Sequence, residues 1–333
     1  MITPDPSKIA LDLDLAHDRP LVSCKFDPTG KFVFAGTESD AVIRWELATK
    51  TKTVLIGHET WVLALACSPD GKILLTGGCD GRLVFWSTNE TQPTPIRMIE
   101  AHAGWVNAIA ISRDGQLAAT VGNDRLTRLW SMVDGSLIQE LPGHDKPIYQ
   151  ILFDTTDKFL LTADLQGRVI QWDLASRKEA RRFDAGKLYA YNAGQQVDYG
   201  GVRDIAFSAD GSLLACAGLI EASNPLGAVS NGAIVLFDWG SGAGKGLLRA
   251  KEDLKGVGWG VRFHPSGFVT MLSGGNGGGV LVFFQPQGPN EFHSFKLPNT
   301  GRALDLHPDT LSYAVAHHDG HLRTYKMPVK PAV

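Results

Sequence analysis

A histidine, a hydroxyl and a carboxylate recur along the chain at a fixed spacing, each time with a tryptophan. A hydroxyl, an imidazole and a carboxylate together are the composition of a nucleophilic catalytic triad. The set occurs twice in full: His58, Thr76, Asp80 and Trp86, then His102, Thr120, Asp124 and Trp130. A catalytic site is needed once, whereas a bracing network is needed in every structural unit. We therefore interpret these residues as structural, because a buried Asp and a buried Trp N–H both need hydrogen-bond partners.

Two further copies are less complete. One keeps His144, Thr162 and Trp172 but has Gln166 at the expected position of the acid. An earlier copy begins at His17 and ends at Trp45, with Ala35 and Ser39 in place of the hydroxyl and the acid.

Two other segments have residue types that can do chemistry. Residues 317–321 (His-His-Asp-Gly-His) form a local histidine and acid cluster, and imidazole with carboxylate suits zinc or nickel. The segment falls on a predicted hairpin turn, where strand alternation separates neighbouring side chains, so we expect no metal there. The glycine-rich residues 273–279 lack the Gly-Lys-Ser/Thr ending of a phosphate-binding loop, and a strand follows directly, so we expect a hairpin turn.

The elements that carry these residues are short strands in a repeated unit. Runs rich in Val, Ile, Leu and Phe alternate with Asp-Gly or Pro-x-Gly turns, which is typical of consecutive antiparallel hairpins. The turn glycine, or its equivalent, falls at positions 30, 71, 115, 157, 211, 267 and 310. Four of the six intervals are about 41–44 residues, the period of a propeller blade.

The repeats resemble the WD40 family over roughly residues 9–325. The resemblance is specific in the first four repeats and looser in the last three, where Phe237, Phe284 and Tyr325 replace the tryptophan. It implies an all-β, seven-bladed propeller with four antiparallel strands per blade. It also implies that each histidine–threonine–acid–tryptophan set is a buried hydrogen-bonded tetrad.

The N-terminal segment predicts how the ring closes. Ile9, Leu11, Leu13 and Leu15 alternate with small or acidic residues, which is a period-2 strand pattern. The segment precedes His17, where each later unit has the outer strand of the preceding blade. We expect residues 9–15 to supply the outer strand of the last blade, within one domain over residues 1–333. The predicted blades are 17–56, 57–100, 101–142, 143–184, 185–250, 251–298 and 299–326 plus 9–15.

Composition narrows the classes of function. The 333 residues have a net charge of −3 and no basic stripe, which argues against a nucleic-acid binder. The four cysteines form no CxxC pair and suit a reducing compartment. No segment is long enough and apolar enough to span a membrane, and the N-terminus has no signal peptide. We therefore expect a cytoplasmic protein with no cofactor.

In WD40 proteins, partners often bind the top face, where the loops with the tetrad His and Asp lie. The resemblance maps that surface onto residues near the start of each innermost strand and onto residues preceding the tetrad acid. These predicted partner-binding residues are Trp61, Trp105, Asn107, Asn123, Tyr149, Arg203, Trp259, Arg302 and His318. Trp, Tyr and Arg are the types enriched in binding hot spots. The alternative for Trp61 and Trp105 is packing between neighbouring loops.

Two insertions belong to the fifth repeat, at residues 184–201 and 218–232. We expect both to project from the top face as a lip beside the central channel, with a tolerated excursion as the alternative. The predicted function is a non-catalytic scaffold that binds a partner protein or peptide on the top face. The alternative is an enzyme, or a propeller that binds a small ligand or metal at the channel.

Overall fold

The computed structural model describes residues 3–224, 229–250, 256–275 and 278–330. In this part of the chain the fold is an all-β propeller of seven blades, each a sheet of four antiparallel strands. Two 3-10 turns, Pro6–Lys8 and Gly186–Leu188, are the helical segments there. This confirms the predicted fold class.

The chain divides into two compact units, described separately below. Unit 2 comprises residues 18–164 and 168–182, and unit 1 comprises residues 1–17, 165–167 and 183–333. Whether both belong to a single domain, as expected above, stays a prediction.

Unit 2 holds blades one to four, apart from the end of the last strand. Within each blade the strands pair in chain order. The strands are β2 (Leu21–Phe26), β3 (Phe32–Thr37), β4 (Ala41–Glu46) and β5 (Lys52–Ile56); β6 (Val62–Cys67), β7 (Ile73–Gly78), β8 (Arg82–Ser87) and β9 (Pro95–Glu100); β10 (Val106–Ile111), β11 (Leu117–Gly122), β12 (Leu126–Ser131) and β13 (Leu137–Pro142); and β14 (Ile148–Phe153), β15 (Phe159–Asp164), β16 (Arg168–Asp173) and β17 (Lys178–Asp184).

Unit 1 holds blades five to seven and one additional hairpin. The strands are β20 (Asp204–Phe207), β21 (Leu213–Asn224), β22 (Val229–Asp238) and β23 (Gly244–Arg249); β24 (Val257–Phe263), β25 (Val269–Gly275), β26 (Gly278–Phe284) and β27 (Glu291–Leu297); β28 (Gly301–Leu306), β29 (Ser312–His317) and β30 (His321–Lys326), with β1 (Ala10–Ala16); and the hairpin β18 (Tyr189–Asn192) and β19 (Val197–Gly200). Of the glycine-rich segment, residues 273–275 end β25 and residues 278–279 begin β26, and Gly275 pairs with Gly278. Residues 276–277 lie outside the described residues.

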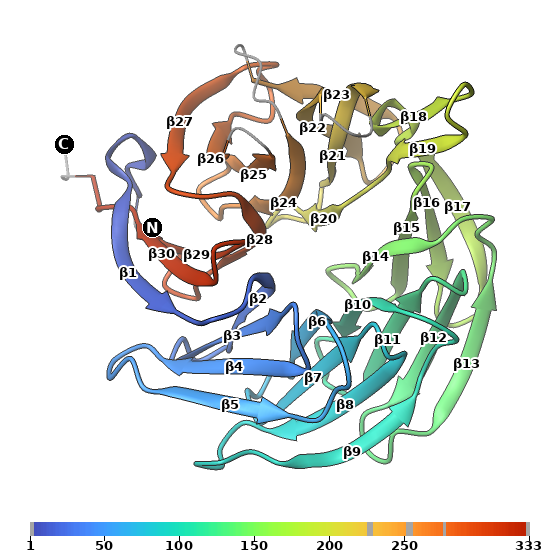
Figure 1. Ribbon diagram of the computed structural model, residues 1–333. Coiled ribbons are helices and arrows are strands. Elements are labelled where there is room, and N and C mark those ends of the chain that lie inside the picture. The colour runs from blue at the N-terminus through green and yellow to red at the C-terminus, as the bar shows by residue number, and fades with distance from the viewer. Residues whose placement is uncertain (1–2, 225–228, 251–255, 276–277, 331–333) are drawn as a thin grey trace. The chain divides into compact units, whose positions relative to one another are not determined.

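The N-terminal strand completes the seventh blade, as predicted. β1 pairs with β30 in the sheet order β1-β30-β29-β28, and Figure 1 shows the blue N-terminal strand beside the red C-terminal one. The simple alternation expected for this strand is interrupted, because the register shifts between Leu11 and Leu13. As a result Leu11 is 51% exposed, whereas Leu15 is only 4% exposed.

The turn between the first two strands of each blade needs a left-handed backbone. The glycines at this position have positive φ, for example +70° at Gly30 and Gly71. The two non-glycine equivalents adopt the same conformation, with φ of 56° at Asp157 and 60° at Thr310. Since this region disfavours side chains with a Cβ, the turn geometry is imposed on these residues by strand pairing on both sides.

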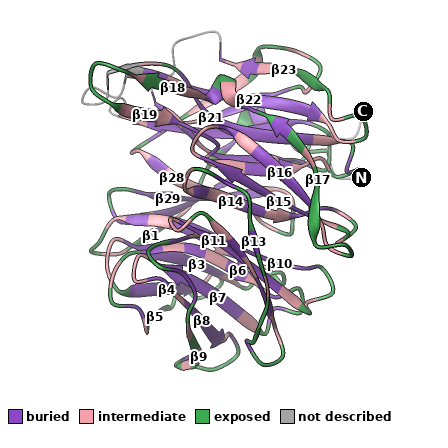
Figure 2. Ribbon diagram, turned by 90° about the vertical axis from the view of Figure 1, so that its right-hand side faces the viewer, coloured by how far each residue is buried: buried purple, intermediate pink, exposed green. Residues whose placement is uncertain are grey.

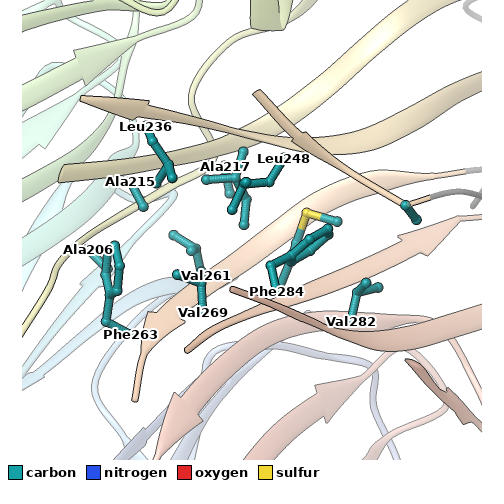
Figure 3. Close-up of a cluster of buried hydrophobic side chains, with 13 residues drawn as sticks. Ala206, Ala215, Ala217, Leu236, Leu248, Val261, Phe263, Val269, Val282 and Phe284 are labelled. Carbon is teal, nitrogen blue, oxygen red and sulfur yellow. The ribbon is translucent and has the colours of Figure 1, made fainter. Parts of the chain in front are cut away.

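The core lies between neighbouring sheets, and the outer strands are partly exposed. Blades five and six bury a cluster in which small alanines of β20 and β21 meet Phe263, Met271 and Phe284 (Figure 3). Figure 2 shows the same gradient within blade four, where β15 and β16 are largely buried and the outer strand β17 is largely exposed. Blade four therefore keeps its outer strand solvated and buries the strands next to it.

Both insertions of the fifth repeat form β structure. The first contains the hairpin β18–β19, in which the Tyr189 hydroxyl donates to Asp198 Oδ1 at 2.5 Å. The second lengthens the β21–β22 hairpin, whose pairing extends to Asn224 and Val229. Residues 225–228 lie outside the described residues. The lip beside a channel stays a prediction.

Candidate functional site: tetrads and the loops they hold

The histidine, threonine, acid and tryptophan of blade two form a continuous hydrogen-bonded set. The Trp86 indole N–H donates to Thr76 Oγ1 at 2.9 Å, and His58 Nε2 lies 2.7 Å from the same oxygen. His58 Nδ1 lies 3.0 Å from Asp80 Oδ2. The histidine and the threonine are buried, and so is the tryptophan. A buried hydroxyl that already contacts both an indole and an imidazole is poorly placed to attack a substrate.

Blade three repeats this arrangement. His102 Nε2 lies 2.8 Å from Thr120 Oγ1 and its Nδ1 lies 2.8 Å from Asp124 Oδ1, while Trp130 Nε1 donates to Thr120 at 2.9 Å. Burial alone would raise the pKa of Asp124, but hydrogen bonds from His102 and Arg128 outweigh it and hold that pKa far below its usual value. The acid is therefore a permanent carboxylate.

Blade four has the same contacts with a different acid. His144 Nε2 lies 2.8 Å from Thr162 Oγ1, and Trp172 Nε1 donates to that oxygen at 2.9 Å. The carboxylate beside His144 Nδ1, at 2.8 Å, belongs to Asp164 and not to Gln166. Placing Gln166 in the acid position was therefore wrong.

Strand register explains the substitution of one acid for another. Asp164 pairs with Ile148 just as Gly78 pairs with Val62 in blade two. A Cβ built on Gly78 would lie 2.5 Å from Asp80 Oδ1 and 2.6 Å from His58 Nδ1. A side chain at this strand position therefore points into the tetrad. In blade four the carboxylate comes from the end of the strand, two residues before the expected position.

In blade seven a histidine, and not a carboxylate, occupies the strand position that corresponds to Asp164. His317 pairs with Gly301 in the corresponding place, and its Nε2 lies 3.0 Å from the Tyr325 hydroxyl. Burial, followed by the charge of Arg323, lowers the pKa of His317 to about 4. The ring is thus a neutral partner of Tyr325. In blade seven the imidazole therefore comes from His317, at the end of β29. In blades two to four it comes from a histidine in a loop.

The assignment of Asp164 leads to a direct test. Asp164→Ala leaves the buried His144 Nδ1 without its carboxylate and should lower the free energy of unfolding by about 1–3 kcal/mol. Gln166→Ala should lower it less, because the carboxylate beside His144 Nδ1 belongs to Asp164. Urea unfolding followed by tryptophan fluorescence measures both variants. Equal losses in the two variants would contradict this assignment.

The side chains of the histidine and acid segment, residues 317–321, contact different partners. His317 faces Tyr325, and His321 Nδ1 lies 2.5 Å from Asp14 Oδ1. Asp319 pairs with Arg323, while His318 is exposed. Within the described ranges, no three His, Cys, Asp or Glu residues are arranged to hold a metal ion.

The tetrads hold the loops from which two exposed tryptophans project. The tetrad acids accept the backbone N–H of the residue after each histidine, at 2.9 Å for Glu59 and 3.2 Å for Ala103. The residue preceding each acid then donates its backbone N–H to a tryptophan carbonyl: Cys79 to Trp61 at 2.8 Å and Asn123 to Trp105 at 3.1 Å. Trp61 and Trp105 are 41% and 47% exposed.

The other predicted residues of unit 2 are less accessible. Asn107 Nδ2 donates to Asn123 Oδ1 at 2.9 Å and to the carbonyl of Ile148 at 2.8 Å. Tyr149 is half-buried. The two asparagines therefore brace the loop ends beside Trp105.

In unit 1 the predicted residues Arg203, Trp259 and Arg302 come together. The guanidinium carbons of Arg203 and Arg302 lie 5.7 Å and 5.0 Å from the centre of the Trp259 ring. His318 is exposed, and its backbone N–H donates to Thr300 O at 3.0 Å. That these residues share one face with Trp61 and Trp105 stays a prediction.

One ionic group in unit 1 was not predicted. Arg262 Nη1 lies 2.6 Å from Asp204 Oδ2, and its Nε lies 3.2 Å from Asp305 Oδ1. Burial raises the pKa of Asp204 despite the neighbouring guanidinium. These residues lie on three innermost strands and have no repeated sequence spacing, so periodicity gave no signal for them.

Comparison with known proteins agrees with the fold. The family model described as WD domain, G-beta repeat matches residues 49–87, 93–131 and 135–173. A Caenorhabditis elegans protein named transcription initiation factor TFIID subunit 5 is 24% identical over 60% of this chain and 29% of its own. The nuclear distribution protein PAC1 of Coccidioides posadasii is 30% identical over 48% of this chain and 40% of its own.

A third relative has a shorter match. The small ribosomal subunit protein RACK1 of Neurospora crassa is 36% identical over 21% of this chain and 24% of its own. The match spans less than half the length of each of these relatives. No helix among the described residues is long and apolar enough to cross a membrane. The chain therefore contains three WD40 repeats, in a fold of seven four-stranded blades with repeated tetrads, and its relatives include WD-repeat proteins.

Proposed function

We propose that this protein is a non-catalytic scaffold that binds a partner protein or peptide on the top face. The observation that carries the proposal is the pair of exposed indoles, Trp61 and Trp105, in neighbouring blades of unit 2. Tryptophan is the residue type most enriched in binding hot spots, where it fills a pocket in the partner. Two such side chains project from corresponding loops of neighbouring blades.

The rigidity of the supporting loops favours binding. Each tryptophan carbonyl is held by the residue next to a tetrad acid, and that acid is itself bonded to a buried histidine. Because the loop backbone is already ordered, docking a partner costs little additional conformational entropy. The tetrad thus contributes to binding indirectly, by fixing the direction in which the indole projects.

The relatives support a scaffold of this kind. One is named as a subunit of a transcription initiation factor, and another is named as a protein of the small ribosomal subunit. Partner binding without catalysis is therefore the proposal for this chain, with no nucleic acid and no membrane as partners. We place it in the cytoplasm because none of its four cysteines, all in the described part, forms a disulfide.

Affinity capture from a lysate of the source organism tests this surface. The Trp61→Ala/Trp105→Ala variant should lose at least about 90% of one protein retained by the wild type, since hot-spot truncations cost more than 2 kcal/mol. The matched control is Ile96→Ala/Met98→Ala, which removes two other exposed apolar side chains of unit 2, 57% and 47% exposed. Equal capture by all three proteins, each with an unchanged thermal midpoint, would refute this binding surface.

A further inference from the structure

The second insertion gives blade five a strand edge that its innermost strand does not cover. β20 has only four residues, and its pairing with β21 ends at the pair Asp204 and Ala217. β21 continues past this point, and in the described sheet Gly218, Leu219 and Ile220 pair with β22 on the other side. A strand edge without a partner strand is a template for pairing with another chain.

The backbone of Leu219 points toward this edge. The Arg203 N–H donates to the carbonyl of Ala217 at 2.7 Å, so that carbonyl faces the β20 side of the strand. Alternate residues of a strand direct their N–H and C=O groups to the same side, and the register is regular from Leu213 to Ile220. Leu219 therefore directs its N–H and C=O beyond the end of β20. Leu219 and Ile220 are nevertheless only 7% and 8% exposed, so other residues cover the edge.

The first insertion supplies this cover. A Cβ built on Gly218 would lie 2.4 Å from the Gly201 carbonyl oxygen and 3.2 Å from Leu188 Cβ. A Cβ built on Gly200 would lie 3.2 Å from Leu219 Cδ1. The 3-10 turn that ends at Leu188 and both strands of the β18–β19 hairpin contact β21, and Figure 1 shows the hairpin beside blade five. The first insertion thus covers the edge that the second insertion creates.

Few apolar contacts hold the first insertion in place. Of residues 186–200, all of which are described, Leu188 is the one with a buried side chain. A two-stranded hairpin is marginally stable by itself, so the docking of this segment depends on that contact. At its end Gly200 and Gly201 have φ of +91° and +83°, a backbone conformation that glycine adopts without strain. The segment should therefore open at a lower cost in free energy than the core strands.

We propose that residues 186–200 form a strap that opens by local unfolding while the rest of blade five stays folded. When the strap is closed, Leu188 packs over Gly218, and the strap keeps other strands from pairing with the edge at Leu219. When it is open, that edge is free to pair. The inference does not rest on the proposed binding surface, because Trp61 and Trp105 belong to the other unit.

Hydrogen exchange of the full chain, read at single amides by NMR, tests the strap. In the wild type the amides of β18 and β19 should exchange at least about 100-fold faster than those of β29, a strand that is buried throughout. The amide of Leu219 should exchange at a rate close to that of the strap amides, because opening of the strap exposes it.

A pair of glycine substitutions in blade five separates the strap from the blade. Gly218→Ala adds a methyl group against the Gly201 carbonyl and should speed exchange of the strap amides and of Leu219 at least about tenfold. Gly244→Ala is the matched control, because this glycine also lies in a strand, neither glycine has a positive φ, and its Cβ would meet nothing within 4 Å. The control should exchange like the wild type, and β29 should be unchanged in both variants.

A second pair tests the buried contact itself. Leu188→Ala removes the buried side chain and should speed exchange of the strap amides at least about tenfold. Tyr191→Ala removes a side chain of the same hairpin that is 55% exposed, and it should leave their exchange close to that of the wild type.

Four results would overturn the proposal. The first is a wild type whose strap amides exchange as slowly as those of β29, since only global unfolding would then expose them. The second is equal exchange in Gly218→Ala and Gly244→Ala, and the third is an unchanged Leu219 amide in a variant whose strap amides exchange faster. The fourth is a variant in which β29 accelerates as much as the strap, because the strap would then unfold only together with the core.

Discussion

A protein that lacks residues 1–16 should lose its cooperative thermal unfolding transition and aggregate. These residues contain β1, which covers the outer edge of β30. Without it, the backbone groups of β30 become an unpaired edge that can pair with another chain. The deletion also removes two buried apolar side chains, Ile9 and Leu15, and so exposes the apolar surface that they cover.

Polar side-chain contacts also join β1 to β30. The backbone N–H of Leu13 donates to Thr324 Oγ1 at 3.1 Å. Asp14 lies 2.5 Å from His321 Nδ1 through one oxygen and 3.2 Å from Arg323 Nε through the other. Burial tends to raise the pKa of Asp14, but the hydrogen bond from His321 and the charge of Arg323 lower it overall. Removing β1 therefore also leaves the largely buried Arg323 without one of its carboxylates.

Differential scanning calorimetry and light scattering measure the effect. A matched pair of point variants separates loss of this strand's packing from a general effect of truncation. Leu15→Asn should lower the free energy of unfolding by about 2–5 kcal/mol, whereas Leu11→Asn, at a site that is 51% exposed, should change it little. A synthetic peptide of residues 5–17, added in trans, should restore part of the transition. A truncated protein that melts like the wild type would show that β1 is dispensable.

The second large effect concerns the tetrad tryptophans. Trp86→Ala should lower the free energy of unfolding by about 3–5 kcal/mol, because it deletes a completely buried ring. Trp86 packs in a cluster with Phe34, Leu55 and Leu74, so its truncation leaves a cavity among them. The substitution also removes the indole donor of Thr76 Oγ1.

Trp86→Phe distinguishes packing from hydrogen bonding. Most of the apolar ring remains, and Thr76 keeps its contact with His58, so the loss should be nearer about 1 kcal/mol. Phenylalanine already occupies the position of Trp86 in two other blades, as Phe237 in blade five and Phe284 in blade six. Urea unfolding of both variants gives the comparison. Losses of equal size would mean that the hydrogen bond, and not the ring volume, stabilises blade two.

Several features could be predicted from local patterns alone. The repeat period and the turn residues identified seven blades, and the alternating leucines near the N-terminus indicated the strand that completes the last one. The histidine, threonine, acid and tryptophan sets of blades two and three could be predicted because each lies within one repeat at constant spacing. Such patterns are visible in the sequence because strand alternation and turn geometry act over a few residues.

Other features depend on which side chains the register brings together. Gln166 has the expected spacing, yet Asp164 contacts His144, because pairing between β14 and β15 directs the end of the strand into the tetrad. Arg203, Trp259 and Arg302 are distant in sequence and meet only because their strands pack side by side with the same offset. Arg262 likewise joins Asp204 and Asp305 across strands of three blades. Hydrogen bonds and cation–π contacts act over a few ångströms in space, so such contacts between repeats arise only when the strands are packed.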